Sequence, residues 1–341
     1  MKTALITGIR GQDGAYLAQF LLEKGYKVYG ADRRSGESTF WRLKELGIEN
    51  EIEIVYMDLI ELTNIYRTIE KIKPDEIYNL AAQSFVGASF EQPILTSDIN
   101  AMGVLRLLEA IRTIGKNIKF YQASTSEMFG KAISSPQDEQ TPFYPRSPYG
   151  ISKLFAHWAT INYRESYNMF NCSGILFNHE SPLRGLDFVT RKITTSVAKI
   201  KLGLIDKFYI GNLNAKRDWG YAKEYVAGMW LMLQQESPDD YVLATGVAHS
   251  VREFIEKAFK LIGIDIVWKG KGIEEKGIDK KSKKVLVEVF DKYYRPADVE
   301  NLVGNPAKAK KKLGWKAKIT FDELINIMLK ADIDKILKER K

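Results

Sequence analysis

The sequence predicts an α/β fold in which a doubly wound parallel sheet is joined to a smaller, interleaved domain in the C-terminal half. Three observations lead to this prediction. Short β-branched runs alternate with longer amphipathic runs over the first half, and the alternation breaks down after about Phe177. The chain also has 341 residues, more than one hydrophobic core usually serves. Repeated strand–helix units favour a parallel sheet with helices on both faces.

The individual elements follow from the spacing of apolar residues, which recur at alternate positions in strands and at every third or fourth position in helices. The first βαβ unit comprises a strand at 3–7, a helix at about 15–24 and a strand at 27–31. Further strands are expected at 52–57, 76–79, 119–122 and 173–177, with helices near 65–72 and 104–114. Beyond them we expect a helix near 192–201, a return strand near 241–244, and a tail of two helices around a tight turn, the second capped and covering 320–329.

These elements divide the chain into two predicted domains. The sheet domain covers 1–177, with a return segment at about 217–246, and the smaller domain covers 178–216 and 247–341. The composition, 45% hydrophobic and 28% charged, is that of a soluble globular protein. The N-terminus enters a strand directly, without the apolar length of a signal peptide, and no stretch approaches a membrane span. A single cysteine, Cys172, excludes an intramolecular disulfide, so we expect a cytoplasmic protein with no membrane partner.

Charge and histidine placement argue against two further classes of protein. The net charge is +8, but the lysines are spread along the chain or gathered at 269–284 and 308–312, which is typical of solvated faces, so no nucleic acid partner is expected. The histidines, His157, His179 and His249, are scattered and there is no cysteine pair. No metal site is therefore expected.

A glycine-rich loop follows the first strand and opens the first helix. Gly8, Gly11 and Gly14 have the spacing Gly-x-x-Gly-x-x-Gly. Glycine triplets also occur as ordinary turns, but inside a βαβ unit they let the backbone approach a diphosphate at a helix N-terminus. We therefore predict a Rossmann dinucleotide site formed by Gly8, Ile9, Arg10, Gly11, Gln12, Asp13 and Gly14.

The end of the second strand leaves the choice of dinucleotide open. An acid such as Asp32 usually binds the adenosine-ribose 2′-hydroxyl of NAD, whereas the adjacent Arg33 and Arg34 suit the 2′-phosphate of NADP. The two arginines favour NADP, and a surface salt bridge between Asp32 and an arginine is a third interpretation. Loops after the third and fourth strands are also expected to reach the cofactor, through Asp58 and Leu59 near the adenine and Leu80, Ala81, Ala82, Gln83 and Ser84 near the nicotinamide half.

A tyrosine and a lysine form the most informative pair. Tyr149 and Lys153 are four residues apart and share one helical face, where the ammonium group can lower the pKa of the phenol. Ser147 and Pro148 are suited to the cap and first position of that helix, which puts Tyr149 in its first turn. Chance Tyr-x-x-x-Lys sequences are common, but a dinucleotide motif upstream favours a catalytic pair over an exposed one.

A hydroxyl and a carboxylate complete the candidate site. Thr125 and Glu127 lie just beyond the predicted strand 119–122, at the edge where doubly wound sheets bind ligands. We predict that Thr125 hydrogen-bonds the substrate oxygen while Tyr149 removes its proton. Glu127 adds an acid or base that simple alcohol oxidation does not need, although a first-turn carboxylate can also merely favour a helix dipole.

Over essentially its whole length the chain resembles the GDP-mannose 4,6-dehydratase family. The resemblance rests on six strings, which are 8-GIRGQDGAYL-17, 79-NLAAQS-84, 121-YQASTSE-127, 178-NHESP-182 with Arg184 and Gly185, 188-FVTRK-192 and 211-GNLNAKRDWG-220. Two departures from the family pattern matter. Arg10 replaces the usual threonine, and Asp32 stands where the family usually has no acid.

The resemblance implies an NADP-binding sheet domain and a nucleotide-sugar-binding smaller domain. It makes Thr125, Glu127 and Tyr149 catalytic, with Lys153 also binding the nicotinamide ribose, and it makes His179 and Arg184 cofactor contacts. The GDP-sugar would be held by Ser84, Thr125, Ser126, Glu127, Asn178, Lys192, Arg217 and Arg295. A homodimer or homotetramer is also implied.

The implied reaction converts GDP-D-mannose into GDP-4-dehydro-6-deoxy-D-mannose without net redox change. Tyr149 takes the 4-hydroxyl proton as hydride leaves C4, Glu127 takes the C5 proton and protonates the departing 6-hydroxyl, and the hydride returns to C6. A GDP-heptose substrate stays open. A 4-epimerase or a 4-ketosugar reductase would use the same tyrosine and lysine but needs no carboxylate two residues after the catalytic hydroxyl, and all of the catalytic residues are intact, which argues against a non-enzymatic NADP sensor.

Overall fold

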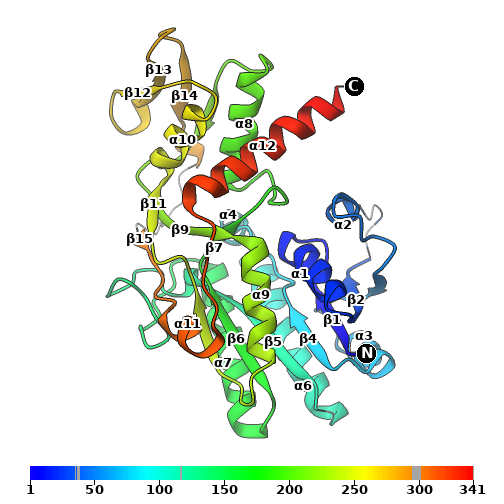
Figure 1. The fold of residues 1–341 in the computed structure, drawn as a ribbon. Coiled ribbons are helices and arrows are strands. Elements are labelled where there is room, and N and C mark those ends of the chain that lie inside the picture. The colour runs from blue at the N-terminus through cyan, green and yellow to red at the C-terminus, as the bar shows by residue number, and fades with distance from the viewer. Residues whose placement is uncertain (35, 37–38, 116, 294–300, 341) are drawn as a thin grey trace.

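The computed structural model describes residues 1–34, 36, 39–115, 117–293 and 301–340. A seven-stranded, fully parallel sheet forms the centre of its larger part (Figure 1). In spatial order the strands are β10 (Asp240–Leu243), β6 (Asn171–Leu176), β5 (Lys119–Thr125), β4 (Glu76–Asn79), β1 (Thr3–Thr7), β2 (Lys27–Asp32) and β3 (Glu53–Tyr56). The strand order reverses between β1 and β4, and that reversal is where doubly wound sheets leave a crevice for ligands.

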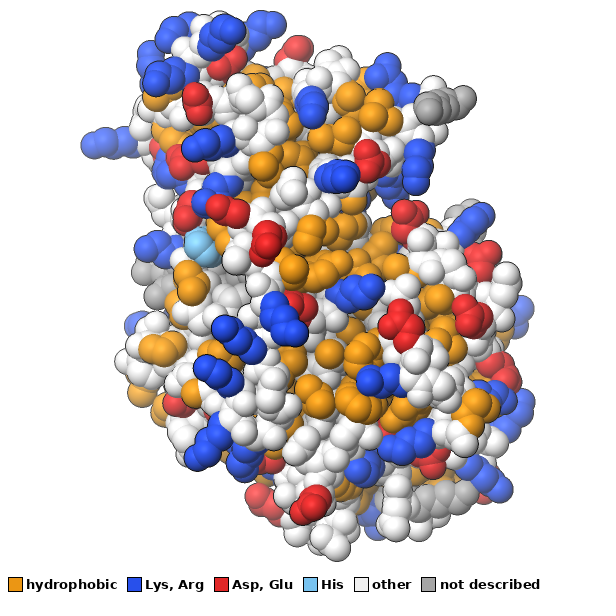
Figure 2. All heavy atoms as spheres, in the orientation of Figure 1, with side chains coloured by type: hydrophobic (Ala, Val, Ile, Leu, Met, Phe, Trp, Pro, Cys, Tyr) orange, Lys and Arg blue, Asp and Glu red, His pale blue; other side chains and the backbone are white. Residues whose placement is uncertain are grey.

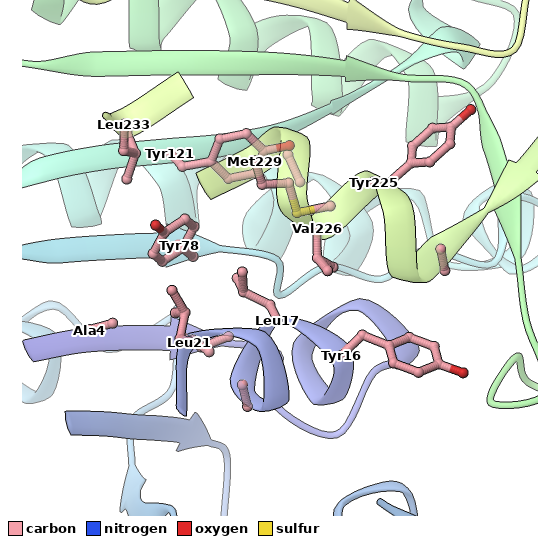
Figure 3. Packing of buried hydrophobic residues seen from close by; sticks show 14 of the residues in the cluster. Ala4, Tyr16, Leu17, Leu21, Tyr78, Tyr121, Tyr225, Val226, Met229 and Leu233 are labelled. Carbon is pink, nitrogen blue, oxygen red and sulfur yellow. The ribbon is translucent and has the colours of Figure 1, made fainter. Parts of the chain in front are cut away.

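Helices cover both faces of this sheet. On one face lie α1 (Gln12–Glu23) and α9 (Ala222–Leu233), and on the other α3 (Leu62–Ile72), α6 (Gly103–Ile114) and α7 (Pro148–Tyr167). Figure 3 shows how the first pair closes its face, with Leu17 and Leu21 of α1 and Met229 of α9 pointing toward Tyr78 and Tyr121 of the sheet. Full burial of each leucine contributes about 1.5–3 kcal/mol.

The smaller part has its own apolar core. One small sheet contains β7 (Asn178–Glu180), β9 (Lys216–Tyr221), β11 (Ala248–Ser250) and β15 (Asn301–Leu302), and a second contains β12 (Ile266–Lys269), β13 (Lys276–Asp279), β14 (Val285–Val289) and β8 (Phe208–Ile210). Around them pack α8 (Val189–Lys201), α10 (Val251–Lys260) and α12 (Phe321–Glu339), while α11 (Ala307–Leu313) packs beside β10. Trp219, Phe254 and Phe321 meet in this core. The predicted domain boundaries stay a prediction.

Short elements complete the chain. They are α2 (Trp41–Glu45), α4 (Val86–Glu91), α5 (Pro93–Ser97), the π-helical turn η1 (Asp98–Met102), and the 3₁₀ turns η2 (Ser126–Met128), η3 (Gly272–Glu274) and η4 (Asp291–Tyr293). Within the described ranges, no helix is long and apolar enough to cross a membrane. Basic side chains on the face shown in Figure 2 are scattered among acidic ones, with a denser group over β12 to β14.

The structure confirms the parallel sheet and corrects several boundaries. Strands 3–7 and 76–79 have the predicted limits. The predicted strand 119–122 continues to Thr125, so Thr125 lies within the strand and not beyond it. Residues 119–122 pair with β4, and residues 120–125 pair with β6, which extends the strand past the end of β4. The first helix begins at Gln12 because Gly11 is its N-cap, and the capped C-terminal helix runs to Glu339.

Candidate active site at the carboxyl edge of the sheet

Two adjoining cavities lie above the carboxyl ends of the central strands. The strand-end cavity, of about 200 Å³, is lined by the glycine loop, the ends of β4 and β5, and the first turn of α7. The outer cavity, of about 440 Å³, is lined by β7, β9 and the start of α8. Phe85, Glu127, Asn178 and Phe188 line both cavities, so these four residues mark the junction.

The glycine loop is packed too closely for any other residue at two of its positions. A Cβ on Gly8 would lie 2.8 Å from the Ala81 nitrogen, and one on Gly14 would lie 2.4 Å from the Gly8 carbonyl oxygen. Gly11 caps α1 without a side-chain hydrogen bond, so the positive end of a twelve-residue helix faces the cavity with backbone groups alone. These features fit the diphosphate of a dinucleotide.

Side chains of the same loop reach across to β7. The Gln12 amide donates to the His179 carbonyl oxygen (2.8 Å) and accepts a hydrogen bond from the Ser181 hydroxyl (2.7 Å). Asp13 Oδ2 lies 2.8 Å from His179 Nε2. Burial alone would lower the pKa of His179, but the charge of Asp13 together with the hydrogen bonds to Asp13 and to the Phe177 backbone outweighs it, and the pKa is raised. The expected cofactor contacts Gln12, Asp13 and His179 therefore also fix β7 over the strand ends.

Tyr149 enters the strand-end cavity from the first turn of α7. The Ser147 hydroxyl accepts a hydrogen bond from the Gly150 nitrogen (3.0 Å), and Pro148 is the first helical residue, as predicted. A Cβ on Gly150 would lie 2.8 Å from the Glu127 carbonyl oxygen, so the start of α7 packs directly on the turn after β5. This contact brings Tyr149, Thr125 and Glu127 to one place, and all three line the cavity.

The protonation of the tyrosine–lysine pair differs from the expectation. Burial raises the pKa of Tyr149 to about 12, although a hydrogen bond with the Thr125 side chain opposes the shift. Burial also lowers the pKa of Lys153 to about 8, and the Lys153 Nζ atom donates to the Ala123 carbonyl oxygen at 2.9 Å. The prediction that Lys153 lowers the phenol pKa is therefore wrong for the protein alone, because burial of the ring is the larger effect.

Thr125 and Glu127 are linked through the backbone. Thr125 is the last residue of β5 and caps η2, its hydroxyl accepting a hydrogen bond from the Glu127 nitrogen at 3.3 Å. Ser126 between them is buried and also lines the strand-end cavity. Glu127 is only partly buried and faces both cavities, so its carboxylate stands within the same site as the Thr125 and Tyr149 hydroxyls.

Cationic side chains surround the junction and the outer cavity. Arg184 lines the strand-end cavity, with its guanidinium 3.5 Å from the centroid of the Phe188 ring. Lys192 and Arg217 line the outer cavity, where the Lys192 ammonium lies 3.2 Å from the centroid of the Tyr293 ring. Asn178 lines both cavities, and Ser84 lines the strand-end cavity. Arg295 lies outside the described residues.

The remaining predicted cofactor residues lie around the cavity without all lining it. Leu80 and Ala82 line the strand-end cavity, while the Ala81 nitrogen donates to the Thr7 hydroxyl (3.1 Å) and the Gln83 nitrogen to the Asn100 side chain (2.8 Å). Ile9 and Leu59 are buried, and Asp58 accepts a hydrogen bond from the Ile60 nitrogen. Arg33 and Arg34 are exposed at the end of β2. The salt bridge considered for Asp32 is present, and its partner is Arg10.

Sequence reasoning missed several residues that shape the site. Phe85 lines both cavities, yet a lone phenylalanine in a loop carries no signal. Glu180 and Trp219 also line the outer cavity. Both belong to sequence strings on which the family resemblance rests, so those strings could have indicated them. Among the described residues, no group of three or more His, Cys, Asp or Glu side chains could hold a metal ion.

Comparison with known proteins finds a family model and relatives that carry the same description. A family model described as GDP-mannose 4,6 dehydratase matches residues 5–328. Proteins named GDP-mannose 4,6 dehydratase from Homo sapiens and Vibrio cholerae are 55% and 51% identical, over 98% and 97% of this chain and 92% and 94% of their own lengths. These matches span nearly the whole of both partners.

Solved structures share the fold at lower identity. A UDP-glucose 4-epimerase from Thermotoga maritima, solved with UDP-glucose, matches 98% of this chain and 99% of its own with a TM-score of 0.81 at 21% identity. A dTDP-glucose 4,6-dehydratase from Bacillus anthracis in complex with NAD matches 100% of both chains with a TM-score of 0.81 at 20% identity. An RMD protein from Pseudomonas aeruginosa complexed with NADPH has a TM-score of 0.76, also at 20% identity, over 98% of this chain and 100% of its own.

Proposed function

The chain belongs to the GDP-mannose 4,6-dehydratase family, and we propose that it converts GDP-D-mannose into GDP-4-dehydro-6-deoxy-D-mannose with NADP as its cofactor. One observation carries the proposal beyond family membership. Glu127 lines both cavities at their junction, beside Thr125 and Tyr149, so an additional acid–base group stands where a sugar would bridge nucleotide and cofactor. Oxidation of an alcohol alone requires no such carboxylate, whereas elimination of water does.

We assign the two cavities to the two ligands. The glycine loop, Tyr149 and Lys153 suit the dinucleotide in the strand-end cavity, and Lys192 and Arg217 suit the diphosphate and nucleotide of the GDP-sugar in the outer cavity. Arg295 is proposed for the same ligand. The sugar ring would then lie at the junction, with C4 toward Tyr149 and C5 and C6 toward Glu127.

The first step of the proposed reaction oxidises C4. NADP, held by the glycine loop, Tyr149 and Lys153, would supply an acceptor for the C4 hydride and a source of the hydride for C6, with no net redox change. Tyr149 takes the proton of the 4-hydroxyl, and the Thr125 hydroxyl hydrogen-bonds the same oxygen. Because burial makes the Tyr149 phenolate costly in the protein alone, Lys153 would have to stabilise it in the loaded site, and it is close enough in sequence, one helical turn away, to do so.

The second step removes water between C5 and C6. The new 4-ketone acidifies the C5 proton, Glu127 takes that proton, and the protonated Glu127 donates a proton to the 6-hydroxyl as it leaves as water. As hydride reduces C6, C5 takes up one proton, which balances the proton that Tyr149 removed from the 4-hydroxyl. One carboxyl group that alternates between base and acid is sufficient for the elimination.

Of the alternative reactions, epimerisation and ketosugar reduction leave part of the site unused. A 4-epimerase or a 4-ketosugar reductase needs Tyr149 and Lys153 but gives Glu127 no role. A GDP-heptose 4,6-dehydratase would use every residue in the same way, so it is the second candidate substrate. The choice of NADP over NAD is supported by Arg33 and Arg34, which are exposed at the end of β2 where the adenosine ribose binds in this fold.

We also propose a homo-oligomer, supported by an apolar face on α7. Ile151, Phe155 and Trp158 lie one helical turn apart, and these residues are 58%, 45% and 54% exposed. Ile94 and Leu95 on the neighbouring α5 are exposed as well. Exposed apolar groups gathered in this way mark protein–protein contacts more often than free surface. A cytoplasmic location is proposed in addition, consistent with the single, buried thiol of Cys172.

The purified protein should be incubated with GDP-mannose, first without and then with added NADP⁺, and the alkali-induced absorbance of a 4-ketosugar followed. Ketosugar formation without net reduction of the cofactor is the expected result. If GDP-mannose gives no ketosugar even with NADP⁺ and GDP-heptose does, the second candidate substrate replaces the first. Isolation of a 4-epimer of GDP-mannose instead would overturn the dehydratase proposal.

A further inference from the structure

Arg10 and Asp32 form an ion pair between the glycine loop and the end of β2. Arg10 Nη2 lies 2.5 Å and Nε 2.7 Å from the same carboxylate oxygen, Asp32 Oδ2. Arg10 also donates to the Arg33 carbonyl oxygen at 3.2 Å. The Asp32 side chain is only 10% exposed and the Arg10 side chain 28%. The pair is therefore partly shielded from water and holds the Asp32 side chain toward the loop.

The ion pair lies at the end of β2, where its charges can affect which dinucleotide binds. In a doubly wound sheet the residue at the end of the second strand meets the adenosine ribose of the dinucleotide. A carboxylate there accepts a hydrogen bond from the 2′-hydroxyl of NAD, but it repels the 2′-phosphate of NADP. Asp32 by itself thus favours NAD, while the neighbouring Arg33 and Arg34 favour NADP.

The arginine is held from a second side as well. The Arg42 Nη1 atom donates to the Arg10 carbonyl oxygen at 2.7 Å, and the Arg10 guanidinium lies 5.7 Å from the centroid of the Phe40 ring. The first contact holds the Arg10 backbone, and the second places an aromatic ring beside its guanidinium. Arg10 and Asp32, the two departures that the sequence resemblance singled out, contact each other in the structure.

We propose that Arg10 determines the cofactor preference of this chain by neutralising Asp32, so that the site accepts the 2′-phosphate of NADP in spite of its acid. This inference rests on the proposed use of NADP. Arg10 and Asp32 compensate for each other, so that loss of Arg10 leaves the Asp32 charge without its partner and shifts the cofactor preference toward NAD.

The test compares dissociation constants for NADP⁺ and NAD⁺, measured by calorimetry on protein stripped of cofactor. Wild type, Arg10→Thr, Asp32→Ser and the double variant are compared. Arg10→Thr should lower the preference for NADP⁺ roughly 10- to 100-fold, the size expected for one lost charge-assisted contact. The double variant should recover the wild-type preference to within about threefold, because no carboxylate is then left to neutralise.

The possible outcomes distinguish failure of the proposed role of Arg10 from failure of the proposed use of NADP. If wild type prefers NADP⁺ and Arg10→Thr keeps that preference, the inference fails and NADP use stands. The inference also fails if the double variant is as impaired as Arg10→Thr, because Arg10 would then act on the phosphate directly. A wild type that prefers NAD⁺ overturns both. Lys27→Thr is the matched control, since it breaks the exposed Lys27–Glu53 pair (3.4 Å) at the opposite end of β2 and should leave both constants unchanged.

Discussion

His179 and Asp13 form a partly buried pair, with 2.8 Å between the His179 Nε2 and Asp13 Oδ2 atoms, although 166 positions separate them in the sequence. His179 Nδ1 lies 2.7 Å from the Phe177 carbonyl oxygen, so both ring nitrogens have partners. The ring also stacks on Tyr225, with 4.7 Å between the centroids. The pair thus joins the start of α1 to β7, the strand that carries Asn178 to the junction of the two cavities.

This pair should make stability depend on pH. The pKa of His179 is raised above its ordinary 6.5, so its contribution is fully present below pH 6.5 and is lost as the pH rises through the folded-state value. The pKa of Asp13 is lowered from 3.8, so its contribution is present above pH 3.8 and is lost as the pH falls through the folded-state value. The pair should therefore stabilise the fold most between those ordinary values.

The measurement is urea unfolding of wild type, Asp13→Asn, His179→Gln and the double variant at about pH 5.5 and pH 9. At the lower pH each single variant should lose about 1–3 kcal/mol, and the double variant less than the sum. The coupling between the two residues should shrink at the higher pH. A coupling of the same size at both pH values would contradict the assignment of a charged His179.

Lys153 should set an alkaline limit on activity. Burial lowers its pKa to about 8, so its ammonium loses its charge above that pH and no longer stabilises the Tyr149 phenolate. We expect kcat/KM for GDP-mannose to fall above about pH 8. In Lys153→Arg, which stays charged, the fall should move upward by at least about one pH unit even if the rate itself is lower. An unchanged alkaline midpoint would assign the fall to another group.

A buried ion pair attaches the C-terminal helix to the site. Arg191 Nε lies 2.9 Å from Asp332 Oδ1, both residues are buried, and Arg191 also donates to the Pro182 and Arg184 carbonyl oxygens. Asp332→Ala should destabilise the protein by about 3–5 kcal/mol in denaturant unfolding, because it leaves a buried guanidinium without its counter-charge.

A matched control lies on the same helix. Asp322 pairs with Lys257 at 2.6 Å, but its side chain is 68% exposed, so Asp322→Ala should cost at most about 1 kcal/mol. Equal losses for the two variants would show that burial does not decide the strength of these pairs.

The apolar face of α7 should hold two copies of the chain together. Phe155→Glu puts a charge into that face and should reduce the mass measured by light scattering toward that of a single chain. Leu337→Glu on α12, where the leucine is 43% exposed, is the control and should leave the mass unchanged. A monomeric wild type would exclude the proposed oligomer altogether.

The sequence predicted what depends on local pattern. The alternation of apolar runs gave the parallel sheet, and the Ser147–Pro148 start of α7 was confirmed. The Asp13–His179 pair could not be predicted, because nothing in a single sequence says which residues 166 positions apart will meet. The salt bridge of Asp32 was considered as one interpretation, but its partner Arg10 lies in another loop and only the fold identifies it.

The electrostatics of the site were the least predictable part. The pKa of Tyr149 is raised where the sequence suggested a lowered value, because the spacing of Tyr149 and Lys153 shows a shared helical face and says nothing of burial. Likewise Thr125 was expected beyond a strand that in fact includes it. The types of the catalytic residues could be predicted from the sequence, but their protonation depends on packing contributed by the whole chain.

The role of Glu127 is tested most directly by mixing cofactor-loaded Glu127→Gln with GDP-mannose and following both the reduced nicotinamide and the 4-ketosugar. We expect the variant to accumulate reduced cofactor, since Tyr149 and Thr125 still oxidise C4, while ketosugar of the 6-deoxy product falls roughly 100-fold or more. Tyr149→Phe should give neither signal. Glu127→Gln that forms the 6-deoxy ketosugar at the wild-type rate would contradict the account.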